Sequence, residues 1–193
     1  KQVEKGDQLG IVNAIPATCF PTASLVACSF DEELVYKMGQ AIAKEALNQH
    51  VAVVLGPGVN IKRNPLCGRN FEYYSEDPLL SGKIGAAFIN GVQSLGVGTS
   101  LKHYAANNQE TNRLTINAVI DARALHEIYL KPFEIAVKEA KPYTIMCSYN
   151  RINGIYSSDN SWLLNNILRR QWGYDGLVVT DWGAINDDFL ARK

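Results

Sequence analysis

Short apolar runs alternate along the chain with longer amphipathic stretches, and this alternation constrains the fold more than any other feature. Residues 51–55 are apolar at every position, which is typical of a strand buried on both faces of a parallel sheet. Further short strands are predicted over residues 98–101, 118–120, 143–148 and 177–180. Helical patterns lie between these runs, so the sequence predicts an α/β protein with right-handed crossover connections.

Capping signals mark the predicted helices. Ser29 and Glu32 have the S-x-x-E spacing of a capping box, which predicts a helix from this point to about His50. Residues 1–30 show no periodic pattern and are expected to form a meandering leading segment. Further helices are predicted from Asp77-Pro78 to about Leu95, from Ala122 (capped by Asp121) to about Ala140, and from Ser161 to about Trp172, with Gly173 just past its end.

The phosphate-binding glycine loops GxGxxG and GxxxxGK[ST] are missing from the sequence, which argues against a nucleotide-binding sheet. Polar clusters instead follow strand after strand, where (β/α)8 barrels place their catalytic groups. We therefore expect a barrel rather than an open sheet. Because such barrels have about 250 residues, residues 1–193 are interpreted as one barrel domain that lacks its first and last elements.

Charge and composition exclude several classes of protein. The chain has 19 basic and 19 acidic side chains, whereas nucleic-acid binding needs a clear basic excess. It has no apolar run of about 18 residues that could span a membrane. The four cysteines show no metal-ligand or disulfide spacing and are expected to be buried thiols. With no apolar leader at the N-terminus, a cytoplasmic location is favoured, while export and self-association stay open.

Lys102 and His103 directly follow a predicted strand, where a lysine is expected to point into a polar opening. With Asn107, Asn108 and Arg113 close behind, the pair indicates a surface that binds hydroxyl groups. A lone histidine is more often structural, and we interpret His50 and His126 in that way.

Arg69 lies between a glycine and an asparagine-aromatic pair. Its rigid fork of donors suits two-point contact with neighbouring hydroxyls or with a carboxylate. An equally simple interpretation is a loop brace, in which Arg69 pairs with Glu72 or Glu76.

Asp181 ends the apolar run 177–180, and a carboxylate that emerges from a buried strand is costly unless it is hydrogen-bonded or functional. The adjacent Trp182 offers a stacking surface for a sugar ring, and Tyr149 follows the preceding strand. The alternative is that Asp181 caps a short following helix.

Five motifs, taken in order along nearly the whole chain, resemble glycoside hydrolase family 3, most closely its β-glucosidases. They span residues 56–61, 68–78, 102–104, 149–150 and 178–183. The resemblance implies that Asp181 is the catalytic nucleophile and that Arg69, Lys102, His103 and Arg113 hold sugar hydroxyls. It also implies that Tyr149 lies beside the nucleophile, that Trp182 forms an aromatic wall of the pocket, and that no metal or organic cofactor is needed.

The resemblance further implies retaining cleavage of a terminal β-D-glucosyl residue from a small β-glucoside or oligosaccharide. The family's acid/base glutamate lies in a second α/β domain, which we expect outside residues 1–193. The N-acetylglucosaminidase branch carries a catalytic histidine in the loop after Lys102-His103, and this loop lacks it. Three alternatives remain: β-xylosidase specificity, a non-catalytic sugar-binding fragment, and a phosphate-binding α/β enzyme that would lack its glycine loop.

Overall fold

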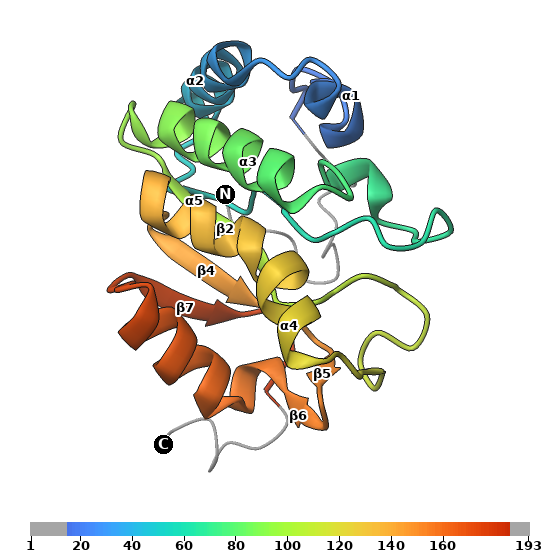
Figure 1. Ribbon diagram of the computed structural model, residues 1–193. Coiled ribbons are helices and arrows are strands. Elements are labelled where there is room, and N and C mark those ends of the chain that lie inside the picture. The colour runs from blue at the N-terminus through green and yellow to red at the C-terminus, as the bar shows by residue number, and fades with distance from the viewer. Residues whose placement is uncertain (1–14, 186–193) are drawn as a thin grey trace.

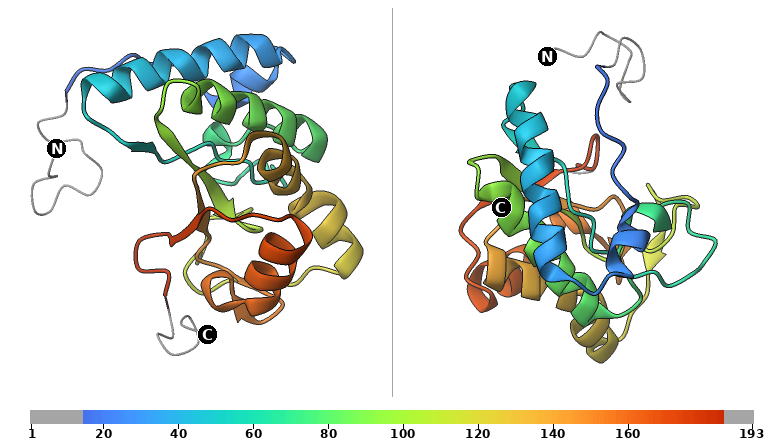
Figure 2. Two further views of the ribbon diagram at one scale, coloured as in Figure 1. Left: turned by 90° about the vertical axis from the view of Figure 1, so that its left-hand side faces the viewer. Right: turned by 90° about the horizontal axis from the view of Figure 1, so that it is seen from above.

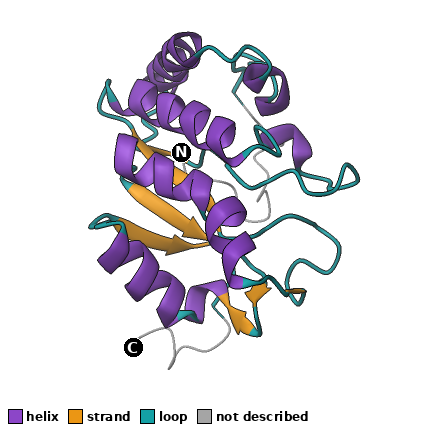
Figure 3. Ribbon diagram, viewed as in Figure 1, coloured by secondary structure: helices purple, strands orange, loops and turns teal. Residues whose placement is uncertain are grey.

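The computed structural model describes residues 15–185, and its main sheet has four parallel strands. Their order is β1 (Val53–Val54), β2 (Gly98–Tyr104), β4 (Thr144–Cys147) and β7 (Leu177–Thr180). The arrowheads of β4 and β7 in Figure 3 point the same way, and because all four strands are parallel, their carboxyl ends lie at one edge of the sheet. The predicted α/β class is confirmed, and these strands follow one another in chain order, as in part of a (β/α)8 barrel.

Helices connect the strands and form a layer beside the sheet. α2 (Glu32–Asn48) packs on α3 (Pro78–Gln93), which packs on α5 (Lys131–Ala140), in the order in which they follow along the chain (Figure 1). The π-helical segment η4 (Trp162–Gln171) joins β4 to β7 and lies at the opposite end of this layer from α2 (Figure 2). The apolar core fills the space between layer and sheet, with Leu101, Ile145 and Phe133 fully buried.

Glycines set the spacing of α2 and α3. A Cβ atom at Gly91 would lie 2.1 Å from the backbone oxygen of Tyr36, and one at Gly39 would lie 2.7 Å from that of Phe88. The two helices therefore cross with their backbones in direct contact, which any larger side chain would prevent.

The strand predicted over residues 118–120 does not join the main sheet. β3 (Asn117–Ala118) pairs instead with β5 (Arg151–Ile152), which pairs with β6 (Ile155–Tyr156) in a small separate sheet. Of the apolar side chains that suggested a core strand, those of Ala118 and Ile120 are half-buried against the core, and Val119 is 82% exposed.

The prediction that residues 51–55 form a strand buried on both faces is also wrong. The strand covers only two of these residues, both half-buried, and Leu55 is 45% exposed. Among the described strands, β1 is one of the two edges of the sheet, the other being β7, and a strand at an edge has one side without a neighbour. Composition alone does not distinguish an edge strand from a central one.

The predicted N-cap of the first long helix, Ser29, is two residues too early. α2 begins after Asp31, whose carboxylate accepts the Leu34 N–H at 2.9 Å. Ser29 instead donates to the carbonyl of Val26 and so closes the short helix α1 (Ala23–Ala27), which the sequence analysis did not predict. Asp77 caps α3 as expected.

The helix predicted over residues 122–140 is broken. α4 (Ala122–Ala124), capped by Asp121 as expected, continues into the π-helical turn η2 (Leu125–Tyr129) before α5 begins. Pro132 lies in the first turn of α5, where its missing N–H is tolerated. The same residue inside a longer helix would leave a carbonyl without its donor, which explains the break. Gly173 follows η4 with φ +70°, as the sequence indicated.

The cysteine prediction is half right. Cys67 and Cys147 are buried, and burial raises the pKa of the Cys147 thiol to about 12. Cys19 and Cys28 are exposed, because the leading segment lies on the surface. Across residues 15–185, every helix is too short or too polar to cross a membrane. Location and self-association stay predictions.

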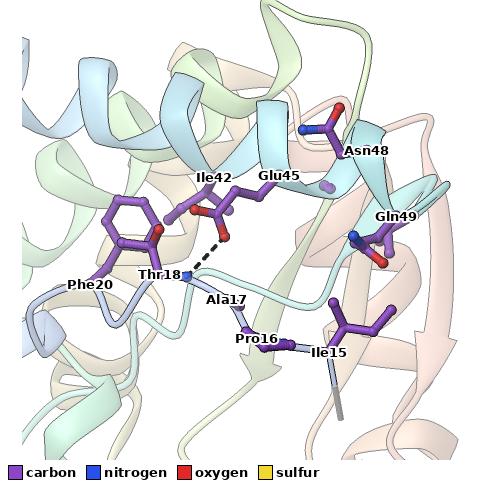
Figure 4. Close-up of a pocket in the computed structure, with 11 residues that line it drawn as sticks. Ile15, Pro16, Ala17, Thr18, Phe20, Ile42, Glu45, Asn48 and Gln49 are labelled. Carbon is purple, nitrogen blue, oxygen red and sulfur yellow. Dashed lines mark hydrogen bonds between the residues drawn. The ribbon is translucent and has the colours of Figure 1, made fainter.

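A groove of about 710 Å³ lies between residues 15–20 and the second half of α2 (Figure 4). Its lining is mainly apolar, and the Thr18 N–H donates to the Glu45 carboxylate there at 3.2 Å. The groove borders Val51, just before β1, and so belongs to the amino end of the sheet. The predicted site residues lie at the other end.

Candidate active site

Asp181 immediately follows β7 at the carboxyl end of the sheet. Its backbone N–H donates to the carbonyl of Cys147 at 3.3 Å and so extends the pairing with β4 by one residue. The residue is 8% exposed, and its Oδ1 accepts the backbone N–H of Trp182 at 2.9 Å. Residues 182–183 form a turn, so within the described chain Asp181 caps no helix.

A bulge in β2 brings two consecutive side chains to the same site. Lys102 pairs with Met146 and Tyr104 with Cys147, which leaves His103 as an extra residue in the ladder. In a regular strand Lys102 and His103 would point to opposite faces, but a bulge redirects the chain. The amide of Asn60 holds this backbone, since it accepts the His103 N–H at 2.8 Å and donates to the His103 carbonyl at 2.9 Å.

Glu72, in the 3-10 turn η1 (Asn70–Glu72), gathers two cations. One carboxylate oxygen forms a short hydrogen bond with Nε of Arg69, and the other lies 3.4 Å from Nζ of Lys102. Burial disfavours the charged guanidinium, but the hydrogen bond to Glu72 together with the charges of Tyr73, Glu72 and Glu110 outweighs it, so the pKa of Arg69 is raised. The loop-brace interpretation of Arg69 is therefore correct, and the brace itself lies beside the site.

Arg69 also fixes the state of His103. Its Nη2 lies 2.9 Å from His103 Nε2, and a guanidinium can only donate, so Nε2 accepts and the ring proton lies on Nδ1. Burial, then the charges of Arg69, Lys102 and Arg113, hold the pKa of His103 well below its usual value. The 3.7 Å separation between Nε2 and Asp181 Oδ2 therefore joins a neutral imidazole and a carboxylate, and it is no ion pair.

Arg113 and Tyr149 pack against each other near Asp181. The Arg113 guanidinium lies 4.9 Å from the centre of the Tyr149 ring and donates to Glu110 at 3.0 Å. The Tyr149 hydroxyl donates to the carbonyl of Trp182 at 2.7 Å. Burial and then the Asp181 carboxylate raise the pKa of Tyr149, so this phenol stays protonated beside the carboxylate.

Trp182 contributes to the site through its backbone, which contacts both Asp181 and Tyr149, while the residue as a whole is 65% exposed. The structure thus brings the predicted site residues to one edge of the sheet, where Trp182 is exposed. Their catalytic and sugar-binding roles stay predictions.

Six charged residues surround this edge, and we call them the strand-end cluster. They are Arg69, Glu72, Lys102, Glu110, Arg113 and Asp181. Three are cations and three are carboxylates, so the cluster has no formal net charge. Two of the carboxylates are engaged by cations, whereas Asp181 faces a neutral histidine and a phenol. Such a site suits an uncharged ligand rich in hydroxyl groups, with one carboxylate left to react.

Sequence reasoning missed Glu72 and Glu110 as parts of the site. Glu72 was considered only as a brace, and Glu110 was not considered. The available signal was their spacing, since each lies three residues from an arginine that was predicted to bind substrate. That signal is weak, because the same spacing occurs on solvent-exposed helices.

Fold and site together define the class: an α/β-barrel protein with a polar site at the carboxyl ends of its strands. Residues 3–190 match the model of the glycosyl hydrolase family 3 N terminal domain. The chain therefore belongs to glycoside hydrolase family 3.

Relatives and solved structures agree with this assignment. The chain is 54% identical to thermostable beta-glucosidase B of Acetivibrio thermocellus over 97% of its own length and 25% of that relative. It is 59% identical to an exo-alpha-(1->6)-L-arabinopyranosidase of Bifidobacterium longum over 91% of the chain and 23% of that relative.

Among solved structures, the Bifidobacterium adolescentis GH3 beta-glucosidase superposes with a TM-score of 0.90 at 58% identity, over 92% of this chain and 26% of that one. Beta-glucosidase 3B of Thermotoga neapolitana, solved in complex with glucose, gives a TM-score of 0.90 at 49% identity, over 93% and 25%. The chain thus spans about a quarter of the length of these relatives.

Proposed function

We propose that the chain supplies the nucleophile and the sugar-binding groups of a retaining β-glycosidase that cleaves terminal β-D-glucosyl residues. The observation that carries the proposal is the setting of Asp181. It is a buried carboxylate at a strand end, held by one backbone N–H and faced by a neutral histidine and a phenol. Membership of glycoside hydrolase family 3 and the similarity to a beta-glucosidase support the glycoside class.

In the proposed first step, an Asp181 oxygen attacks the anomeric carbon, and the bond to the leaving oxygen breaks. The product is a glycosyl ester of Asp181, which water hydrolyses in the second step with net retention. Arg69, Lys102, His103 and Arg113 are proposed to hold ring hydroxyls. These contacts accelerate the reaction only where they strengthen as the ring approaches the oxocarbenium ion.

The second carboxyl group of a retaining enzyme lies about 5–5.5 Å from the nucleophile. Within the described residues, Glu72 and Glu110 are the other carboxylates of the strand-end cluster, and cationic side chains engage both. We assign them to holding those cations. We propose that the acid/base comes from a part of the whole protein outside this chain, in line with its quarter coverage of the relatives.

A second specificity is favoured by a particular observation, the 59% identity to an exo-alpha-(1->6)-L-arabinopyranosidase. An α-L-arabinopyranoside shares the orientation of the glycosidic bond and of the hydroxyls at C2 and C3 with a β-D-glucoside. It differs by an axial hydroxyl at C4 and by the absence of the hydroxymethyl group. We therefore extend the proposal to both sugars, with β-xylosides as a further candidate and a non-catalytic sugar-binding fragment as the alternative.

The test uses the chain with 2,4-dinitrophenyl 2-deoxy-2-fluoro-β-D-glucoside. Its leaving group needs little protonation, so a nucleophile without its acid can still form the ester. Intact mass and peptide mapping should locate the label on Asp181. The matching 2-fluoro-xyloside and a 2-fluoro-α-L-arabinopyranoside rank the sugars by labelling rate. Binding of glucose without labelling by any reagent would favour the non-catalytic fragment.

A further inference from the structure

Glu110 lies in the loop that follows β2, and its two carboxylate oxygens have different partners. Oε2 accepts from Nη1 of Arg113 at 3.0 Å, and Oε1 accepts from Nδ2 of Asn107 at 3.2 Å. The side chain is 21% exposed. One carboxylate therefore joins an arginine beside Asp181 to an amide that is 2% exposed.

The amide of Asn107 continues the chain of hydrogen bonds to His103. Its Nδ2 also donates to the hydroxyl oxygen of Tyr73 at 3.0 Å, and that oxygen lies 3.1 Å from His103 Nδ1. Because Arg69 occupies Nε2, the proton of the neutral ring lies on Nδ1 and is donated to Tyr73. Tyr73 is fully buried, so this link is shielded from solvent.

Glu110 determines which groups donate and which accept in this series of hydrogen bonds. A carboxylate can only accept, so it requires the NH₂ side of Asn107 to face it, and the same NH₂ group then faces Tyr73. A neutral glutamine at this position would offer one acceptor and one donor. Its oxygen could still accept the hydrogen bond from Arg113, but its NH₂ group would then face the NH₂ group of Asn107. Two donors cannot form a hydrogen bond with each other.

We propose that Glu110 is a positioning residue that holds two substrate-binding side chains at once, Arg113 directly and His103 through Asn107 and Tyr73. The inference rests on the proposed function for its effect on sugar binding. The effect of Glu110 on the hydrogen bonds of His103 can be measured whether or not the chain is active. The side-chain contacts of Glu110 are with Asn107 and Arg113, so it acts on the site through these two residues.

The first experiment measures long-range ¹H–¹⁵N spectra of the chain labelled at histidine. In the unmodified chain, His103 should show a protonated Nδ1 and an unprotonated Nε2. In Glu110→Gln the Nδ1 and Nε2 resonances of His103 should shift, because the Asn107 amide no longer donates to the Tyr73 hydroxyl. The matched control is Glu134→Gln, which removes a carboxylate that also accepts from two side chains, in this case two lysines of the helix α5.

The second experiment measures labelling of Asp181 by the 2-fluoro-glucoside as a function of reagent concentration. Glu110→Gln should raise the concentration for half-maximal rate about tenfold, the effect of one lost hydrogen bond, and change the maximal rate much less. The Glu134→Gln variant should match the unmodified chain in both parameters.

These outcomes separate the inference from the proposed function. If the unmodified chain is not labelled, the nucleophile proposal fails, and the His103 spectrum still decides the role of Glu110. If Glu110→Gln and Glu134→Gln give the same spectrum and the same labelling, the inference is overturned. Should Glu110→Gln not fold, Tyr73→Phe keeps the buried volume and removes the same link. An unchanged His103 spectrum in that variant would overturn the inference equally.

Discussion

The strand-end cluster and the outer face of α5 contain ion pairs with the same spacing in sequence. Arg69–Glu72 and Lys131–Glu134 are both separated by three residues. In the cluster, the side chains of Arg69 and Glu72 are 20% and 19% exposed, and Glu72 also reaches Lys102 on another element. On α5, Lys131 is 44% exposed, and both cations that hold Glu134 belong to its own helix.

The spacing of two charged residues in the sequence therefore does not define the role of the ion pair that they form. A pair that joins separate elements fixes the geometry between them, whereas a pair within one exposed helix adds little. Burial works to raise the pKa of Glu134, but hydrogen bonds from Lys138 and Lys131 lower it below its usual value. These ion pairs therefore stabilise the charged form of Glu134, but they hold no residue outside α5 in place. Variants in the two regions, and at the crossing of α2 and α3, test this contrast.

The largest effect is expected for Asp181→Asn, which keeps the shape of the side chain and removes the nucleophile. Labelling by the 2-fluoro-glucoside should fall by on the order of 10⁴-fold, while binding of glucose persists. Mass spectrometry measures the first and calorimetry the second. Asp175→Asn, in an exposed loop six residues earlier, is the control. Labelling that survives in Asp181→Asn would contradict the assignment of the nucleophile.

Gly91→Ala addresses the helix layer. The added methyl group would lie 2.1 Å from a backbone oxygen of α2, so the helices must separate. We expect a loss of roughly 3 kcal/mol in the free energy of unfolding, measured by urea denaturation. Gly68→Ala is the control, because its new Cβ would meet nothing closer than 3.8 Å. Equal stability of the two variants would refute the close crossing of α2 and α3.

Lys102→Met and Lys138→Met compare two lysines that each pair with a glutamate. In the cluster, losing a charged hydrogen-bond donor should raise the half-maximal reagent concentration by about 10- to 100-fold. On α5 the same change should leave labelling unaltered. Equal labelling of both variants would show that the lysine of the strand-end cluster affects the reaction no more than the lysine on α5 does.

The low pKa of His103 predicts a pH dependence of stability. The unfolded chain binds a proton on this histidine near its ordinary value of 6.5, whereas the folded chain does not. Below that pH the unfolded state therefore holds more protons, and the free energy of unfolding falls by up to about 1.4 kcal/mol per pH unit.

Urea titrations at about pH 7.5 and about pH 5.5 measure this loss. His103→Gln should reduce the difference between the two pH values, while His50→Asn, at an exposed position, should retain it. An undiminished difference in His103→Gln would mean that this histidine is not the group that titrates.

The smallest effect is expected for Glu134→Gln on α5. Intrahelical pairs of this kind contribute about 0.3–0.5 kcal/mol each and are screened by salt. The loss in stability should therefore stay below about 1 kcal/mol and disappear at high ionic strength. A larger, salt-independent loss would show that Glu134 does more than pair along its own helix.

Much of the site could be predicted because the chemistry follows the strands directly. Asp181 comes straight after the apolar run of β7, and Lys102 and His103 end the run of β2. What could not be predicted is how the side chains are held. The bulge at His103 is a matter of register with β4, and the partners of Glu72 and Glu110 lie on other elements or across a folded loop.

The sequence by itself determined the alternation of strands and helices, the parallel class of the sheet and the position of polar residues at strand ends. Local patterns of burial and capping are enough for these, because they depend on near neighbours. The tertiary structure decided which strand is an edge, which short strand leaves the main sheet, and where Pro132 breaks a helix. It also decided that Glu72 reaches Lys102 and that Asn107 links Glu110 to Tyr73, because only packing brings residues from separate segments into contact.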